Sequence, residues 1–321
     1  MRNSFNETEV RVVVEQRTAI TEEVIQLELR NEDGSNLPAW EPGSHIELIL
    51  SESTVRQYSL CGDPADRSCW KIAVLRDVSG RGGSQRIHNE LQEKSFVTAR
   101  GPRNLFPLRP SRHYLFIAGG IGITPMLPMI SAVAKSGARW AIHYGGRSRQ
   151  SMAFVDQLLE FDHSGVHLYP QDEVGFIDLG SALADPDPET LVYCCGPEPL
   201  LSAVEDRCRS TWPPDSLCLE RFSPRAIDEH AAETAFQVEL VQSGKTITVN
   251  PGQSILDAVE QSGVPVLSSC MEGTCASCEV AVLDGVPDHR DSVLDERERE
   301  AGKTMMICVS RATSTRLAID L

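Results

Sequence analysis

The first hundred residues alternate short runs of β-branched residues with turn residues. Four such runs lie at residues 10–14, 24–29, 45–50 and 70–75. A further strand carries Arg56-Gln-Tyr58-Ser59, and a helical run over 85–91 follows Gly80-Arg-Gly-Gly-Ser84. Short strands at this spacing are typical of an antiparallel β-barrel.

The pattern changes after residue 106. Continuous apolar runs predict strands at 114–118, 140–144 and 190–194, and the first runs through a glycine-rich turn into an apolar helix that reaches about residue 134. Strands that alternate with helices predict a parallel sheet in an α/β domain, with ligands at the carboxyl ends of the strands.

The last third of the chain predicts a smaller α+β domain. A hairpin is expected at 236–240 and 247–249, followed by a helix over 254–262. The preceding stretch lacks periodic hydrophobicity and is typical of a linker. We therefore expect a multidomain protein, with a β-barrel over 1–106, an α/β domain over 107–225, a linker over 226–235 and a third domain over 236–321.

Composition and charge exclude some classes of function. The 321 residues carry a formal net charge of −16 and contain no run of eighteen apolar residues. We expect no nucleic-acid partner, no membrane span and a cytoplasmic location. From residue 226 onward 16 acidic residues face 7 basic ones, a net charge of −9. That acidity is either a plain solvated surface or a means of steering towards a redox partner.

Four of the ten cysteines form a recognisable pattern. Cys270, Cys275 and Cys278 lie in one loop and Cys308 follows near the C-terminus, which gives C-x4-C-x2-C-x29-C. This spacing is typical of a plant-type 2Fe-2S cluster, in which each iron takes two sulfur ligands. Gly273 and the small residues Ala276 and Ser277 allow the loop to wrap closely.

Two other uses of these cysteines are possible, a structural zinc site and disulfides. A structural zinc site normally has two C-x2-4-C knuckles, and the second knuckle is missing here. Disulfides are disfavoured because the N-terminus lacks an apolar signal stretch, so we expect a reducing compartment. The other cysteines are scattered without metal spacing, and we expect most to be buried, with Cys195 as the exception.

Two stretches in the first domain suit a flat ring that carries a phosphate. Arg56, Tyr58 and Ser59 could combine a cation with a stacking aromatic, although the motif taken alone is weak and favours an ordinary strand. Gly82, Gly83 and Ser84 precede a helix, and a glycine-rich helix N-terminus accepts phosphate.

The α/β domain carries a second glycine-rich turn, Gly119-Gly-Ile-Gly-Ile-Thr-Pro. A strand, a glycine turn and a helix form a dinucleotide cradle, although the spacing differs from G-x-G-x-x-G. We expect Thr124 to cap the helix and Pro125 to occupy its first turn. The other two strands end at Gly145-Gly-Arg147-Ser-Arg149 and at Cys195-Gly-Pro.

These motifs, in this order, resemble the phthalate dioxygenase reductase family, the reductases of Rieske oxygenase systems. The resemblance rests on Arg-x-Tyr-Ser, Gly-Gly-Ile-Gly-Ile-Thr-Pro, Cys-Gly-Pro-x-Pro-Leu and the cysteine loop, and it covers nearly the whole chain. It implies an FMN-binding barrel, an NAD domain and a plant-type ferredoxin domain of the β-grasp fold.

The resemblance also implies individual roles. Arg56 would pair with the FMN phosphate, Tyr58 would stack on the isoalloxazine, Ser59 would face its reactive edge, and Gly82, Gly83 and Ser84 would complete the phosphate site. Gly120, Gly122 and Thr124 would hold the NAD diphosphate, and Cys195 would lie beside the nicotinamide. Glu220 and Phe222 resemble the family's acidic and aromatic pair near the flavin, although Phe222 could also be a core aromatic.

The implied function is electron transfer from NAD(P)H through FMN and the 2Fe-2S cluster to a terminal oxygenase with a Rieske centre. The family favours NADH, yet Arg147 and Arg149 could accept the 2'-phosphate of NADPH. Two alternatives stay open. The same electron chain could serve a cytochrome P450, or the third domain could be an iron-sulfur redox sensor.

Overall fold

In the computed structural model the chain divides into two compact units, Met1–Glu220 and Arg221–Leu321. Residues 8–51, 54–162, 164–225 and 234–321 are described. The predicted linker over 226–235 lies largely outside these residues. Among them no helix is long and apolar enough to cross a membrane.

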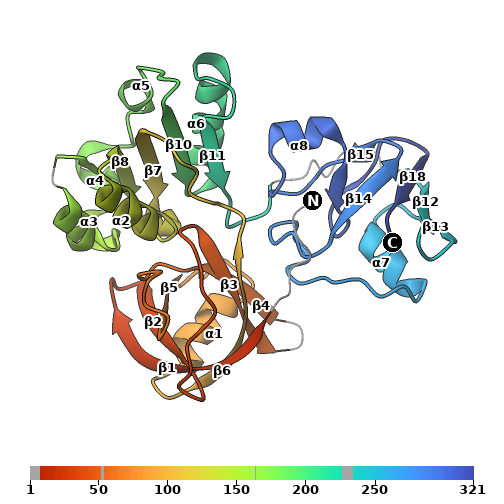
Figure 1. Ribbon diagram of the computed structural model, residues 1–321, viewed down its shortest axis with the longest axis horizontal. Helices are drawn as coiled ribbons and strands as arrows, with labels where there is room; N and C mark the ends of the chain where they lie inside the picture. Colours follow the sequence, from red (N-terminus) through yellow and green to blue (C-terminus); the bar gives the residue numbers. More distant parts are fainter. Residues whose placement is uncertain (1–7, 52–53, 163, 226–233) are drawn as a thin grey trace. The chain divides into compact units, whose positions relative to one another are not determined.

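The first unit begins with a six-stranded antiparallel sheet in the order β4-β3-β6-β1-β2-β5. Alternate residues of β1, among them Val10, Val12 and Val14, are buried, as the sequence pattern predicts. Leu60, just after β4, bridges to Ile72 of β5, so the two edge strands of the sheet meet. The predicted antiparallel barrel is thereby confirmed. Its elements are labelled in Figure 1: β1 (Glu9–Ala19), β2 (Val24–Asn31), β3 (Ser44–Ser51), β4 (Thr54–Ser59), β5 (Trp70–Leu75), α1 (Gly83–Glu90) and β6 (Phe96–Asn104).

The same unit continues into a five-stranded parallel sheet in the order β11-β10-β7-β8-β9. Phe116 and Ile142 pack on one face with α2 and α3, and Ile117 and Val192 pack on the other with α6. Both faces are covered, which explains the continuous apolar strands. The elements are β7 (His113–Gly119), η1 (Gly120–Ile123), α2 (Met126–Ser136), β8 (Arg139–Gly146), η2 (Arg149–Ser151), α3 (Val155–Phe161), β9 (Val166–Pro170), α4 (Gln171–Val174), α5 (Leu179–Ala182), β10 (Thr190–Cys195), α6 (Glu198–Thr211) and β11 (Leu217–Glu220).

Barrel and parallel sheet share part of their cores. Val24 and Ala73 of the barrel belong to the same buried cluster as Phe116 and Ile130. The connection after β6 is tied to the sheet, because Arg109 N–H donates to the Tyr193 hydroxyl at 2.7 Å. This packing holds the first unit together.

The second unit is built on a five-stranded sheet in the order β13-β12-β18-β14-β16, in which β12 and β18 run parallel. Helix α7 starts with a capping box between Ser254 and Asp257 and buries Ile255 and Leu256. This is the predicted α+β domain. Its elements are β12 (Phe236–Leu240), β13 (Lys245–Val249), α7 (Ile255–Gln261), β14 (Glu279–Asp284), β15 (Pro287–Asp288), α8 (Glu296–Ala301), β16 (Thr304–Met306), β17 (Arg311–Ala312) and β18 (Arg316–Ile319).

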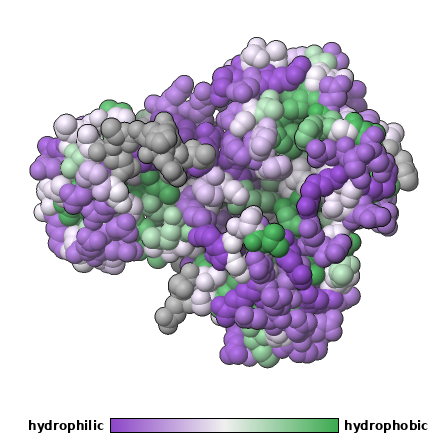
Figure 2. Space-filling model, turned by 180° about the vertical axis from the view of Figure 1, so that it is seen from behind, coloured by the Kyte–Doolittle hydropathy of each residue, from purple (hydrophilic) through white to green (hydrophobic). Residues whose placement is uncertain are grey.

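The surface in view is mainly hydrophilic. Figure 2 shows hydrophilic residues over most of the face in view, with scattered apolar patches. The large apolar side chains that are most exposed include Phe176, Val78 and Leu267.

Candidate functional site

The barrel brings Arg56 and the start of α1 together. Arg56 lies on β4, and its guanidinium donates to the carbonyls of Val55 at 2.8 Å and Arg81 at 3.2 Å. A side chain at Gly83 would put its Cβ 2.4 Å from Arg56 Nε, so only glycine lets the arginine reach the helix N-terminus. Gly82 caps that helix in the left-handed region with φ of 78°. A cation beside free helical N–H groups suits a phosphate.

Ser59 and Ser84 differ in what their hydroxyls contact. Ser59 is buried, and its Oγ has no hydrogen-bond partner among the described residues. An orphaned buried hydroxyl of this kind fits a bound polar ligand atom. Ser84 Oγ instead accepts from Asp77 N–H at 3.0 Å and so holds the loop before α1. Burial raises the pKa of Tyr58, so its hydroxyl stays neutral beside Arg56.

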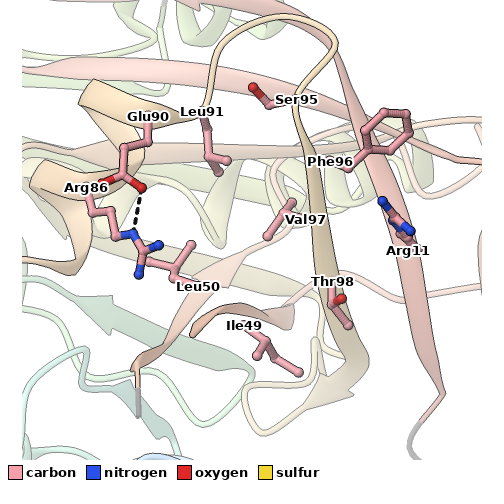
Figure 3. Close-up of a pocket in the computed structure, with 10 residues that line it drawn as sticks. All are labelled: Arg11, Ile49, Leu50, Arg86, Glu90, Leu91, Ser95, Phe96, Val97 and Thr98. Atoms are coloured by element: carbon pink, nitrogen blue, oxygen red, sulfur yellow. Dashed lines mark hydrogen bonds and ion pairs between the residues drawn. The ribbon is translucent and has the colours of Figure 1, made fainter. Parts of the chain in front are cut away.

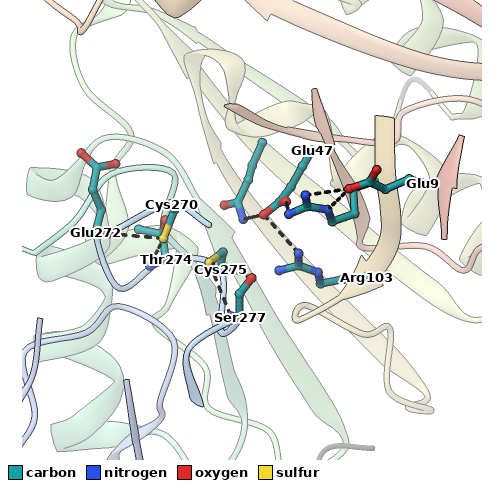
Figure 4. A network of polar contacts seen from close by, with 10 residues as sticks. Glu9, Glu47, Arg103, Cys270, Glu272, Thr274, Cys275 and Ser277 are labelled. Atoms are coloured by element: carbon teal, nitrogen blue, oxygen red, sulfur yellow. Dashed lines mark hydrogen bonds and ion pairs between the residues drawn. The ribbon is translucent and has the colours of Figure 1, made fainter. Parts of the chain in front are cut away.

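A buried carboxylate fixes the strand that carries this site. Glu47 on β3 accepts from Gln57 Nε2 at 3.3 Å and pairs with Arg103 at 3.2 Å and Arg100 at 3.4 Å (Figure 4). Gln57 lies between Arg56 and Tyr58, so the network holds β4 against its neighbours. The sequence pattern did not single out Glu47, because it lies among apolar residues of a predicted strand.

The glycine turn of the parallel sheet packs against the end of β10. A Cβ at Gly122 would lie 2.3 Å from the Cys195 carbonyl oxygen, and one at Gly119 would lie 2.6 Å from Pro197 Cδ. Gly120 has φ of 55° and open space where a side chain would stand. The turn therefore presents bare backbone beside Cys195, as a cradle for a diphosphate requires.

The predicted cap at Thr124 is wrong. The turn is a 3-10 helix that runs directly into α2, and Thr124 has helical backbone angles. Its hydroxyl donates back to the Ile121 carbonyl at 3.0 Å, and Pro125 takes the N-cap position without a side-chain hydrogen bond. The tight 3-10 turn already places the backbone in register for α2, so no extended capping residue is needed.

Cys195 and Glu220 end two neighbouring strands, β10 and β11. The Cys195 thiol contacts Glu220 Oε2 at 3.9 Å. Burial raises the pKa of Glu220 to about 8 and raises the pKa of Cys195 well above its ordinary value. At neutral pH both groups are therefore uncharged.

Arg147 meets acidic residues that sequence analysis missed. It pairs with Glu23 of the barrel, and its carbonyl accepts from Asp172 N–H at 3.3 Å. Asp172 lies two residues after β9, within the short helix α4, and the five-residue strand β9 is not singled out by the sequence pattern. An acidic residue just after a strand in a parallel sheet was the available signal.

Phe222 follows β11 and belongs to the second unit. It is 44% exposed, which contradicts the interpretation as a core aromatic. Its place beside a flavin stays a prediction.

The cysteine loop of the second unit turns sharply. Met271, Gly273 and Ala276 all have φ between 59° and 67°. A Cβ at Gly273 would lie 2.5 Å from Val309 Cγ2 and 3.0 Å from Asp291 Cα, so glycine is required by space and by conformation. The loop thereby closes on the segment that carries Cys308.

The four predicted sulfur ligands come together. Cys275 and Cys308 thiols bond the Cys270 sulfur and lower its pKa, Cys308 lowers the pKa of Cys278 in the same way, and these bonds raise the pKa of the two donors Cys275 and Cys308. Backbone N–H groups of Glu272 and Ser277 donate to the sulfurs of Cys270 and Cys275 at 3.4 Å each (Figure 4). Sulfurs that share protons and accept backbone bonds suit a cluster that needs thiolates.

The cysteines are not paired with one another in disulfides. All ten lie in described residues and are free.

A groove of about 610 Å³ lies elsewhere on the barrel (Figure 3). Its lining includes Phe96, Leu91 and Ile49, and none of its lining residues is a predicted site residue. Arg86 pairs with Glu90 at 2.7 Å and Arg11 with Glu32 at 3.4 Å. The groove contains none of the residues predicted to bind flavin, and its two arginines already form ion pairs with carboxylates.

Comparisons with known proteins agree with this arrangement. The model of the oxidoreductase NAD-binding domain matches residues 116–206, and that of the 2Fe-2S iron-sulfur cluster binding domain matches 238–313. Phenoxybenzoate dioxygenase subunit beta of Ectopseudomonas oleovorans is 41% identical over 94% of this chain and 93% of its own length. The structure of phthalate dioxygenase reductase is 34% identical, with a TM-score of 0.70 and 98% of each chain covered.

The chain belongs to the phthalate dioxygenase reductase family. As a member it is a nicotinamide-dependent oxidoreductase that carries electrons to a 2Fe-2S cluster, and the predicted nucleotide and cluster domains are confirmed. A further structure, an intact type IV self-sufficient cytochrome P450 monooxygenase, is 45% identical with a TM-score of 0.91. The match covers 98% of the present chain and 41% of that longer protein.

Proposed function

We propose that this reductase takes hydride from NADH onto FMN and delivers single electrons through its 2Fe-2S cluster to a separate terminal oxygenase with a Rieske centre. One observation carries the proposal. The same chain contains both the four grouped cysteine sulfurs and the glycine turn that packs against Cys195. A bound flavin supplies the conversion from an electron pair to single electrons.

The choice of FMN rests on the barrel. Arg56, Gly82 and Gly83 would hold one terminal phosphate, and the orphaned Ser59 hydroxyl would meet a polar edge of the ring. The short stretch after Ser59 offers no insertion for an adenine. Extraction of the purified protein tests this choice: one FMN per chain is expected, and FAD would contradict it.

NADH is the proposed coenzyme because a carboxylate already pairs with Arg147. Glu23 contacts the guanidinium, and Asp172 and Glu173 lie in the first turn of α4, whose Asp172 N–H donates to the Arg147 carbonyl. A 2'-phosphate would have to displace the pair and meet further negative charge. The kcat/KM for NADH should exceed that for NADPH by roughly tenfold or more, in line with the energy of one charged contact.

A cytochrome P450 is the second candidate acceptor, because a P450 fusion protein contains a region 45% identical to this chain. Stopped-flow reduction of each purified acceptor by the NADH-reduced protein separates the candidates. Rapid transfer to the Rieske oxygenase alone supports the proposal.

A redox sensor would need no path from nucleotide to flavin. The glycine turn, Cys195 and the Arg56 site therefore favour sustained turnover. Repeated reduction of cytochrome c by NADH is the distinguishing measurement, and a single turnover would support a sensor instead.

A further inference from the structure

Ser292 joins two segments of the second unit through hydrogen bonds. Its Oγ accepts from Arg225 N–H at 2.9 Å. Its own N–H donates to the Gly273 carbonyl at 2.8 Å, in the middle of the cysteine loop. One residue thus ties the chain that leaves the parallel sheet to the loop that carries three of the four cluster ligands.

The surroundings of Ser292 keep it in place. The neighbouring Asp291 is fully buried, and its Oδ2 accepts from the N–H groups of Val293 at 2.9 Å and Leu294 at 2.8 Å. Arg299 Nε donates to the Leu294 carbonyl at 2.9 Å. A turn fixed at both ends gives Ser292 a rigid base from which to hold its two partners.

The segment held by Ser292 begins where the nucleotide site ends. Glu220 is the last residue of β11 and contacts Cys195. The chain then passes through Phe222 to Arg225 within five residues. The contact pattern assigns all five residues, 221–225, to the second unit.

We propose that Ser292 is a positioning residue for electron transfer from flavin to cluster. Its Oγ ties Arg225 to the cluster-bearing unit, and its N–H ties the cysteine loop to the same residue. Phe222 belongs to the same unit as the cluster. A role of Phe222 at the flavin rests on the proposed function.

The step that this clamp serves is a one-electron transfer. One electron leaves the reduced flavin and one enters the oxidised cluster, NADH is the source, and no bond is made or broken. The clamp acts by holding residues 221–225 and the cysteine loop in a fixed relation within the second unit, so its loss lowers the rate of this step alone.

Two pairs of variants test the clamp. Ser292→Ala removes the acceptor and Ser292→Thr keeps it. Arg225→Pro removes the N–H donor and Arg225→Lys keeps it. We expect Ser292→Ala and Arg225→Pro each to slow cluster reduction about threefold to tenfold, the effect of one hydrogen bond. The Thr and Lys variants should behave like the parent, and hydride transfer to flavin should be unchanged in all four.

Hydrogen exchange supplies a readout that needs no turnover. The Arg225 amide should be protected in the parent and in Ser292→Thr, and should exchange faster in Ser292→Ala. In the double variant Ser292→Ala/Arg225→Pro, cluster reduction should be no slower than in either single variant, because both changes break the same bond.

Three outcomes would overturn the inference. These are an unprotected Arg225 amide in the parent, unchanged cluster reduction in Ser292→Ala, and loss of the visible circular dichroism of the cluster in that variant. If NADH fails to reduce flavin in the parent, the proposed function fails, whereas protection of Arg225 still reports on the clamp by itself.

Discussion

Cys275 is almost fully buried, and the Ser277 N–H group bonds its sulfur. We predict that Cys275→Ser loses most of the cluster, because a serine hydroxyl ionises far less readily than a thiol and binds iron weakly. Electron delivery to the oxygenase should fall roughly tenfold or more, while flavin reduction by NADH continues. The measurements are the visible spectrum, iron content and stopped-flow traces.

The matched control is Cys208→Ser, a buried cysteine on α6 that is not a predicted ligand. It should keep the full cluster content. If Cys275→Ser still delivered electrons at the parent rate, the assignment of this ligand would be wrong.

Glu220 gives a prediction about pH. Its pKa is about 8 in the folded protein against an ordinary value of 4.5, so the folded state holds its proton more tightly than the unfolded state. Its favourable contribution to stability is therefore fully present below pH 4.5 and falls as pH rises to about 8. Glu220→Gln should lack this decline. Thermal unfolding of both proteins between pH 5 and pH 9, followed by near-ultraviolet circular dichroism, is the measurement.

At pH 9 the Gln variant should be the more stable of the two, and at pH 5 the two should lie close together. Parallel curves over the whole range would show that the carboxyl group titrates normally.

Of all the site predictions, the cluster ligands could be predicted most fully from residue type and spacing alone. Four thiols at one spacing admit few chemistries, and Gly273 could be assigned to the loop because a left-handed turn there requires it. The ion-pair partner of Arg147 could not be predicted, since Glu23 lies 124 positions away in the sequence. Only folding shows which carboxylate reaches that arginine.

At the scale of elements, the glycine turn is the part most sensitive to a single methyl group. Gly122→Ala would put its Cβ 2.3 Å from a backbone carbonyl oxygen that cannot rotate away. We predict a loss of about 1–3 kcal/mol of stability in the first unit, the usual range for overpacking. NADH should bind more weakly, and the cluster spectrum should be unchanged.

Gly137→Ala is the control, because Gly137, the C-cap of α2, has positive φ but open space where a Cβ would stand. It should cost stability without weakening NADH binding. Equal effects of the two variants on NADH affinity would remove the turn from the nucleotide site. Urea unfolding and titration of NADH against flavin absorbance provide the two quantities.

Elements with a regular apolar period could be predicted, and those interrupted by glycine or proline could not. Strand β6 runs through Gly101-Pro102, a pair that normally marks a turn. It stays a strand because the pairing of β3 with β6 shifts register between His45 and Glu47, and proline is tolerated at such a bulge. The 3-10 turn before α2 was missed for a related reason, since a Thr-Pro pair signals a cap in most sequences.

At the scale of the molecule, the charge of the second unit suggests how the reductase meets its acceptor. Residues 226–321 carry a net charge of −9, and Met271 in the cysteine loop is 46% exposed. Transient redox complexes are small and are steered by charge. We therefore predict that an acidic surface around Met271 and Thr274 meets a basic patch on the oxygenase.

Salt should slow this encounter. Screening shortens the Debye length to about 10 Å near 0.1 M salt, so the association rate should fall as salt is added. Stopped-flow electron transfer from the pre-reduced protein to its oxygenase, across a salt series with oxygenase limiting, measures that rate. Flavin reduction at saturating NADH is the internal control, because hydride transfer from bound NADH needs no docking of a second protein. A flat association rate would rule out steering and leave the acidic surface with a role in solubility alone.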